Sequence, residues 1–195
     1  MLTRARIVRE ATELFSLKGF FHTTLDDVMN RTGLTKGGFY AHFDSKEALV
    51  HAAIEHATER WVTKVFGSVM EHATARAQMV ALFDAYRAYA VDRTFEGGCF
   101  FVNLAIELDD QHDALRRIVD ARFDQLRNVV ADIVERGKID GTYRREAPSP
   151  AIATLVVASL TGTMMLAKSA ASFDAFEHTV AMLRHFVASY EEPAP

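Results

Sequence analysis

The sequence predicts an all-α protein in which three short amino-terminal helices are followed by a larger set of long helices. The chain has 10 glycines and 4 prolines, together 14 of 195 residues, and all four prolines lie beyond residue 147. Apolar residues recur at intervals of three and four along most of the chain. Because glycine and proline interrupt helices and this spacing places apolar side chains on one helical face, helices are expected and a β-sandwich is not.

The charge is distributed unevenly along the chain. There are 22 Lys+Arg and 26 Asp+Glu, a net charge of −4, but residues 1–51 hold 7 basic and 6 acidic residues, a balance of +1. Residues 52–195 hold the other 15 and 20, a balance of −5. Because affinity for a polyanion comes mainly from lysine and arginine, any contact with nucleic acid is expected to be local and amino-terminal.

The composition favours a cytoplasmic protein. Cys99 is the only cysteine, so an intrachain disulfide cannot form and a reducing compartment is the simplest setting. Charged residues among the first thirteen leave no room for the apolar segment of an export signal. The uncharged stretch 151–167 is short for a bilayer span and is interrupted by polar residues, so no membrane partner is expected.

The first two helices follow from their caps and apolar spacing. One is expected over residues 3–18, with Thr3 as its N-cap. The next is expected over residues 25–32, where Thr24 is the N-cap and Asp27 completes a short capping box.

A third helix, KGGFYAHF over residues 36–43, is expected after the glycine turn at Gly33, with Thr35 as its N-cap. Two helices about three residues apart around a glycine have the spacing of a helix-turn-helix. The adjacent Gly37 and Gly38 cost a helix about 2 kcal/mol relative to alanines, which close approach to a ligand would explain. Alternatively, these residues form a loop in which the glycines adopt positive φ.

A long fourth helix begins at Lys46 after the N-cap Ser45, and its apolar positions continue to Val65. It couples an amino-terminal domain, residues 1–47, to a second domain, residues 48–195. The remaining helices are expected at about 75–92, 99–109, 112–137, from 149 through the apolar run 151–167, and at 173–190, with a main loop over 137–150.

The last helix carries an apolar seam with spacings of 3, 4, 3, 4 and 3, suited to packing against another helix. Its members are Phe173, Phe176, Val180, Leu183, Val187 and Tyr190. Together with the apolar helix before it, the seam predicts a homodimer through residues of about 151–190. The alternative is a seam inside the core of one chain.

Segment 24–46 brings three helix N-termini together, each offering free backbone N–H groups to a phosphate. Side chains on these helices can add contacts, and Lys36 can donate to guanine in a major groove. The predicted DNA-binding residues are Thr24, Thr35, Lys36, Gly37, Gly38, Tyr40, His42 and Lys46. Phe39 and Phe43 are expected to anchor the third helix while Tyr40 and His42 face outward.

The stretch ATELFSLKGFFHTTLDDVMNRTGLTKGGFYAHFDSKEAL, residues 11–49, resembles the TetR family of bacterial transcriptional repressors, and the resemblance covers residues 3–50. The rest matches in length and helical layout alone. The resemblance implies phosphate contacts at the matching Thr24, Tyr40, His42 and Lys46, and base contacts over 35–38. Two departures are Met29 at a position where many members have alanine, and the missing basic arm before the first helix.

The resemblance also implies a palindromic double-stranded DNA operator, a small-molecule effector enclosed by the carboxy-terminal helices, and release of DNA when the effector binds. Candidate effector contacts are Trp61, Tyr86, Tyr89, Cys99, Asn103, Glu107 and Phe123. Aromatic residues at helical spacing are more often core than ligand contacts, so Asn103 and Glu107 are the stronger candidates.

Cys99 follows two glycines at a predicted helix start, where the helix dipole favours a thiolate. Some TetR relatives that sense electrophiles or oxidants look similar here, which makes Cys99 a candidate sensing thiol. The alternative is a buried, inert cysteine.

An enzyme is not expected, because the sequence contains no nucleophile elbow, HExxH pair, phosphate loop or dinucleotide-binding glycine pattern, and no cofactor or metal is implied. The acid-rich run 107–113 is interpreted as a solvated, helix-capping turn rather than a metal site. The remaining alternative is an all-helical small-molecule binding protein without a DNA role.

Overall fold

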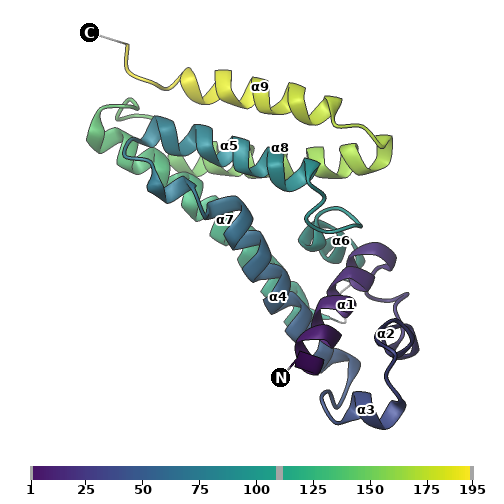
Figure 1. The fold of residues 1–195 in the computed structure, drawn as a ribbon. Coiled ribbons are helices and arrows are strands. Elements are labelled where there is room, and N and C mark those ends of the chain that lie inside the picture. The colour runs from purple at the N-terminus through teal and green to yellow at the C-terminus, as the bar shows by residue number, and fades with distance from the viewer. Residues whose placement is uncertain (1, 109–111, 194–195) are drawn as a thin grey trace. The chain divides into compact units, whose positions relative to one another are not determined.

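The computed structural model describes residues 2–108 and 112–193, and this part of the chain is helical and contains no strand. The all-α prediction is confirmed. The helices are α1 (Leu2–Lys18), α2 (Leu25–Thr32), α3 (Lys36–Tyr40), α4 (Lys46–Phe66), the 3-10 turn η1 (Val69–Glu71), α5 (Ala75–Val91), α6 (Phe100–Glu107), α7 (Asp113–Asp140), α8 (Ser149–Ala170) and α9 (Asp174–Ala188), as Figure 1 shows.

The chain forms two compact units. The N-terminal unit comprises Met1–Trp61 and Arg93–Val119, and therefore contains α1 to α3, most of α4, α6 and the start of α7. The C-terminal unit comprises Val62–Asp92 and Asp120–Pro195, and contains α5, the rest of α7, α8 and α9. The N-terminal unit thus includes a segment that lies far beyond residue 47 in the sequence.

Helix α1 packs its predicted apolar face into the N-terminal unit. Ile7 and Ala11 are fully buried and Phe15 nearly so, as helical spacing requires. The helix begins at Leu2, so Thr3 lies within it, and the prediction of Thr3 as the N-cap is wrong. It ends at Lys18, and Gly19 follows with φ +88°, which a residue with a side chain rarely adopts.

The C-terminal unit is built around α8 and α9, which pack against each other, and α9 also packs on α5 (Figure 1). The seam of α9 faces this interior: Phe176 is 0% exposed and Val187 3%. Four of the six seam residues are therefore buried inside one chain, as the alternative of an internal core seam expects, while Phe173 and Tyr190 are half-buried. Periodicity predicts a buried face without indicating which helix covers it.

Helix α8 begins at Ser149 with Pro150 in its first turn, as predicted. By length and composition alone it could cross a membrane, but Ile152, Val156 and Leu160 are fully or almost fully buried within the unit. Such burial is what the core helix of a globular unit requires.

Other helix ends differ from the predictions by a few residues. Helix α7 continues to Asp140, into the segment expected to be loop. Helix α6 ends at Glu107, and residues 109–111 of the acid-rich run lie outside the described residues.

Candidate nucleic-acid interface

The start of α2 is fixed by the predicted capping box. The Asp27 amide donates to Thr24 Oγ1 over 3.1 Å, and the Asp27 carboxylate accepts from the Thr24 amide over 2.8 Å. Lys18 Nζ also lies 2.8 Å from Asp27 Oδ1. The bond from Lys18, followed by those from Thr24, holds the pKa of Asp27 well below its usual range. Thr24 itself stays exposed at the helix end.

The turn between α2 and α3 has the geometry of a helix-turn-helix. Gly33 adopts φ +66°, and the amide of Leu34 donates to the carbonyl oxygen of Met29 over 3.0 Å. From α1, Arg6 donates to the carbonyl oxygen of Thr32 over 2.9 Å and so satisfies the end of α2. Met29 is half-buried at this crossing, so the helices accommodate its side chain without losing the turn.

Helix α3 includes both adjacent glycines in helical conformation. The Gly38 amide donates to Thr35 Oγ1 over 3.2 Å, and neither Gly37 nor Gly38 has positive φ, so the loop alternative is wrong. The helix is shorter than the predicted 36–43 and ends at Tyr40. There the His42 amide donates to the carbonyl oxygen three residues earlier over 2.9 Å, which tightens the last turn.

The side chains of residues 39–43, at the end of α3 and just after it, divide as predicted. Phe39 is 0% exposed and Phe43 4%, and they anchor the segment, whereas Tyr40 is 43% exposed and His42 is exposed. The guanidinium of Arg4 lies over the Phe43 ring, 4.9 Å from its centroid, and covers the anchor from α1. Tyr40 and His42 therefore face solvent, while Phe39 and Phe43 hold the segment against the core.

The two glycines of α3 differ in what surrounds them. A Cβ on Gly37 would meet nothing within 4 Å. A Cβ on Gly38 would lie 3.3 Å from Thr35 Oγ1, the atom that caps the helix. The fold thus gives no reason for glycine at position 37, although glycine destabilises a helix interior by about 1 kcal/mol relative to alanine.

Lys46 begins α4, whose N-cap Ser45 accepts from the Ala48 amide over 3.1 Å, as predicted. Its ammonium lies 4.4 Å from the centroid of the Phe20 ring. Burial lowers the pKa of Lys46, while the negative charges of Glu47 and Glu107 oppose that shift. The predicted phosphate contact therefore lies against the turn that precedes α2.

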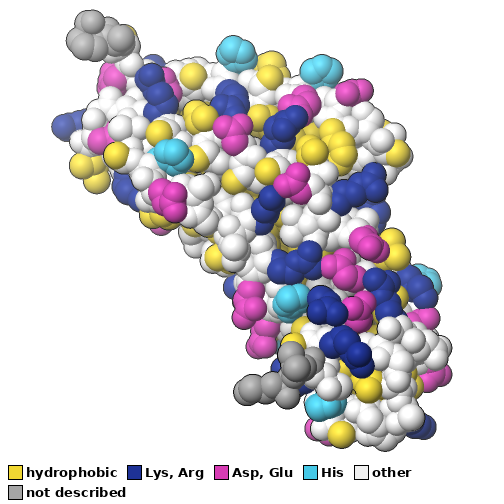
Figure 2. Space-filling view, viewed as in Figure 1, with side chains coloured by type: hydrophobic (Ala, Val, Ile, Leu, Met, Phe, Trp, Pro, Cys, Tyr) yellow, Lys and Arg dark blue, Asp and Glu magenta, His cyan; other side chains and the backbone are white. Residues whose placement is uncertain are grey.

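All eight predicted DNA-binding residues lie within the N-terminal unit, on or next to α2, α3 and the start of α4. Figure 2 shows basic and acidic side chains intermixed on the visible face of the molecule, rather than one continuous basic surface. Among the described residues, no group of three or more His, Cys, Asp or Glu could hold a metal ion.

The candidate effector residues fall into both units. Trp61, Cys99, Asn103 and Glu107 belong to the N-terminal unit, and Tyr86, Tyr89 and Phe123 to the C-terminal unit. Trp61 packs on Phe101 with ring centroids 5.8 Å apart. Tyr86 lies 5.7 Å from Tyr89 and stacks on Phe176 at 6.4 Å. Each of these rings has packing partners in its own unit.

The polar candidates Asn103 and Glu107 face backbone groups of the N-terminal unit. The side-chain amide of Asn103 donates to the carbonyl oxygens of Ser16, over 3.1 Å, and Gly97, over 2.8 Å. The Glu107 carboxylate accepts from the Phe21 amide over 3.2 Å. Both side chains thus contact the end of α1 and the turn after it, partners that the sequence does not indicate, and their role as effector contacts stays a prediction.

Cys99 is the N-cap residue of α6, which confirms its predicted place at a helix start. It is 4% exposed and forms no disulfide.

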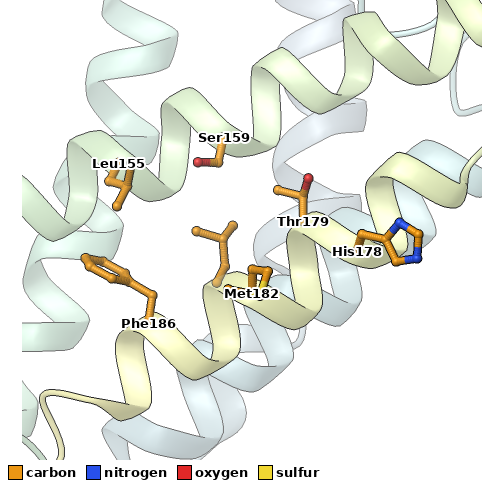
Figure 3. Close-up of a pocket in the computed structure, with 7 residues that line it drawn as sticks. Leu155, Ser159, His178, Thr179, Met182 and Phe186 are labelled. Atoms are coloured by element: carbon orange, nitrogen blue, oxygen red, sulfur yellow. The ribbon is translucent and has the colours of Figure 1, made fainter.

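Sequence reasoning missed a groove on the surface of α8 and α9 (Figure 3). It has a volume of about 350 Å³ and is lined by Leu155, Ser159, His178, Thr179, Met182, Leu183 and Phe186. Figure 3 shows Leu155 and Ser159 projecting from α8 towards α9, and Met182 and Phe186 lying opposite. Met182 is 66% exposed and Leu155 44%. The feature of the sequence that could have indicated this groove is the presence of apolar residues on α8 and α9 outside the buried seam.

Two helices joined by a glycine turn, with an exposed polar face on the second, define a helix-turn-helix protein. Residues 7–53 match the family described as bacterial regulatory proteins, tetR family, and residues 75–183 match the Tetracyclin repressor-like, C-terminal domain. The chain belongs to the TetR family. Members of this family are transcriptional regulators rather than enzymes.

Individual relatives agree with this assignment. A TetR transcriptional regulator from Chloroflexus aurantiacus J-10-FL is 34% identical, with a TM-score of 0.93 over 98% of this chain and 97% of that one. The transcriptional repressor DhaR of Mycobacterium sp. strain GP1 is 26% identical over 85% of this chain and 82% of its own. A cysteine mutant of the TetR family regulator CifR, complexed with 26 bp operator DNA, shares the fold, with a TM-score of 0.78 over 95% of each chain at 19% identity.

Proposed function

We propose that this regulator is a cytoplasmic homodimeric repressor that binds a palindromic operator and releases it when an effector binds. The observation that carries the DNA-binding surface is Gly37, a helical, solvent-facing glycine that the fold does not require. Close approach of the α3 backbone to a base pair edge accounts for the absence of a side chain there. The name of the relative DhaR supports the repressor role.

The proposed contacts divide into two kinds. Phosphates are bound by the N-terminus of α2 with Thr24, and by Tyr40, His42 and Lys46. Bases are read by segment 35–38, in which Lys36 donates to guanine. Because so few side chains reach the bases, a second copy reading the other half of a palindrome supplies much of the specificity.

The proposed dimer uses the groove face of α8 and α9. Leu155 and Met182 of the groove are 44% and 66% exposed, Leu166 on the same side of α8 is 53% exposed, and residues 151–167 carry no charge. A Cβ on Gly162 would meet nothing within 4 Å, so packing within one chain does not require glycine at that position either. Such apolar, uncharged faces are typical of self-complementary interfaces.

The dimer is tested by sedimentation equilibrium. Met182→Glu places a charge on the groove face and is expected to shift the protein to monomer. Ile139→Glu, at a position that is 87% exposed in the same unit, is the matched control and is expected to leave the mass unchanged. A monomeric wild-type protein at micromolar concentration overturns the dimer.

The proposed effector is a small, largely apolar molecule or an electrophile. Cys99, the N-cap residue of α6, is the candidate sensing thiol. Treatment with a thiol reagent is expected to release DNA from the wild-type protein but not from Cys99→Ser. If the reagent releases DNA equally from both proteins, or from neither, Cys99 is not the sensing thiol. The effector is then one that binds without a covalent bond.

The DNA role is tested by footprinting on the sequences upstream of the protein's own gene and its neighbours. The expected result is protection of a palindromic region, with an affinity that falls steeply as salt rises because several phosphates are contacted. A protein that binds apolar small molecules but protects no DNA supports the alternative of a binding protein without a DNA role.

A further inference from the structure

The turn between α1 and α2 is held from outside by residues around the end of α6 and the start of α7. The Phe21 amide donates to Glu107 Oε2 over 3.2 Å. The His112 ring lies edge-on to Phe20 and Phe21, with centroid distances of 5.8 and 5.0 Å. All four residues belong to the N-terminal unit, although almost ninety positions separate Phe21 from Glu107.

Gly19 shows how closely Glu107 fits this turn. A Cβ on Gly19 would overlap the Glu107 carboxylate, and the φ of +88° already disfavours a side chain there. Glycine is thus required both by the backbone conformation and by the carboxylate that occupies the adjacent space.

Asn103, one helical turn before Glu107, makes a second attachment. Its side-chain amide donates to the carbonyl oxygen of Ser16, in the last turn of α1, and to that of Gly97. Helix α6 therefore contacts the end of α1 and the following turn at two points on one face.

The turn in question leads directly to two groups of the proposed DNA interface. Within it, Thr23 Oγ1 donates to the carbonyl oxygen of Gly19 over 2.7 Å, and the next residue, Thr24, caps α2. The Phe20 ring lies under the Lys46 ammonium. A displacement of the turn would therefore move both the α2 N-terminus and the platform on which Lys46 rests.

We propose that Glu107 and Asn103 of α6 are positioning residues for DNA binding, which hold the turn over residues 19–23 so that Thr24 and Lys46 meet the phosphates together. This inference rests on the proposed DNA interface. It gives a role in the DNA-binding surface to two residues that the sequence predicts as effector contacts.

The test compares Glu107→Gln with Glu107→Ala in the full-length protein, using a duplex that contains the footprinted region. Glutamine keeps an oxygen that can accept from the Phe21 amide, whereas alanine removes the acceptor. Alanine is expected to weaken binding about tenfold and to reduce the salt slope by about one phosphate contact. Glutamine is expected to restore both, because the position of the turn matters rather than the charge.

Glu55→Ala removes the same charge from an exposed site of α4 in the same unit, and is expected to leave the salt slope unchanged. The melting temperature of each variant shows whether it is folded at the temperature of the binding measurement. Asn103→Ala gives a second measurement if Glu107→Ala does not fold, and it is expected to reduce the slope in the same way.

Three results would overturn the inference: Glu107→Ala with wild-type affinity and slope, Glu107→Gln as weak as alanine, or both variants binding more tightly than wild type. A wild-type protein that binds no upstream duplex overturns the proposed function instead. The two failures are therefore distinguishable.

Discussion

Glycines in α3 and glycines in the packed interior have opposite surroundings. A Cβ on Gly37 would meet nothing within 4 Å, whereas a Cβ on Gly97 would overlap the carbonyl oxygen of Ser16, and one on Gly137 would overlap the Tyr143 ring. The interior glycines are explained by the chain's own packing, and Gly37 is not. A residue type that the fold leaves unexplained is therefore the better indicator of a binding surface.

Aromatic residues in the C-terminal unit show the other side of this contrast. Tyr86, Tyr89 and Phe176 are at most 2% exposed and pack on one another. Burial of large rings is sufficient to account for them. Their abundance therefore supports a core and gives no independent support for an effector site.

The largest effect on stability is expected from Phe176→Ala in this core. Removing a fully buried ring is expected to lower the free energy of unfolding by about 3–5 kcal/mol. Ile139→Ala, at a position that is 87% exposed in the same unit, is expected to change it by less than about 0.5 kcal/mol. Chemical denaturation of both variants measures the difference, and similar losses would show that burial does not separate the two sites.

Gly97→Ala is expected to have the next largest effect. The added methyl group would collide with backbone of α1, which cannot move aside like a flexible side chain, so a loss of about 1–3 kcal/mol is expected. DNA binding is expected to weaken as well, because the contact lies at the end of α1 that leads to α2. An unfolding midpoint equal to that of wild type would contradict this interpretation of Gly97.

How much the sequence predicts depends on how local the cause is. The capping box of α2 was predictable because Thr24 and Asp27 are three residues apart and bond to each other. The early end of α3 was not predictable, because alanine and histidine, the residue types at 41 and 42, do not terminate helices. The helix ends there because its last turn closes with a bond between residues three apart, before the next N-cap at Ser45.

The DNA-binding surface was more predictable than the attachments behind it. Tyr40 and His42 face outward because Phe39 and Phe43, which alternate with them, are buried, as the spacing alone indicates. Asn103 bonds to Ser16 of α1 and Glu107 to Phe21 of the turn that follows it, both more than eighty positions away. A polar pair on an apolar helix shows that something polar is opposite, but not whether it is a ligand or the chain itself.

Acid titration is expected to reveal a smaller effect at the start of α2. The bond from Lys18 lowers the pKa of Asp27 in the folded protein, so its contribution is complete above about pH 4, where the unfolded carboxylate is ionised. That contribution is lost as the pH falls from there towards the folded pKa. The melting temperature of wild type is therefore expected to exceed that of Asp27→Asn at neutral pH, and the gap is expected to close on acidification. A gap that is independent of pH would contradict the ionic contribution.

The smallest change in stability, and of opposite sign, is expected from Gly37→Ala. Because the site is helical and open, alanine is expected to raise the free energy of unfolding by up to about 1 kcal/mol. The same methyl group is expected to weaken binding to the footprinted duplex at least about tenfold, because it keeps the α3 backbone away from the bases. Asn128→Ala, at an exposed position of α7, is the control for a gain in helix stability without a change in DNA affinity. A Gly37→Ala protein that is both more stable and fully competent to bind DNA would remove the main reason for placing the base contacts at α3.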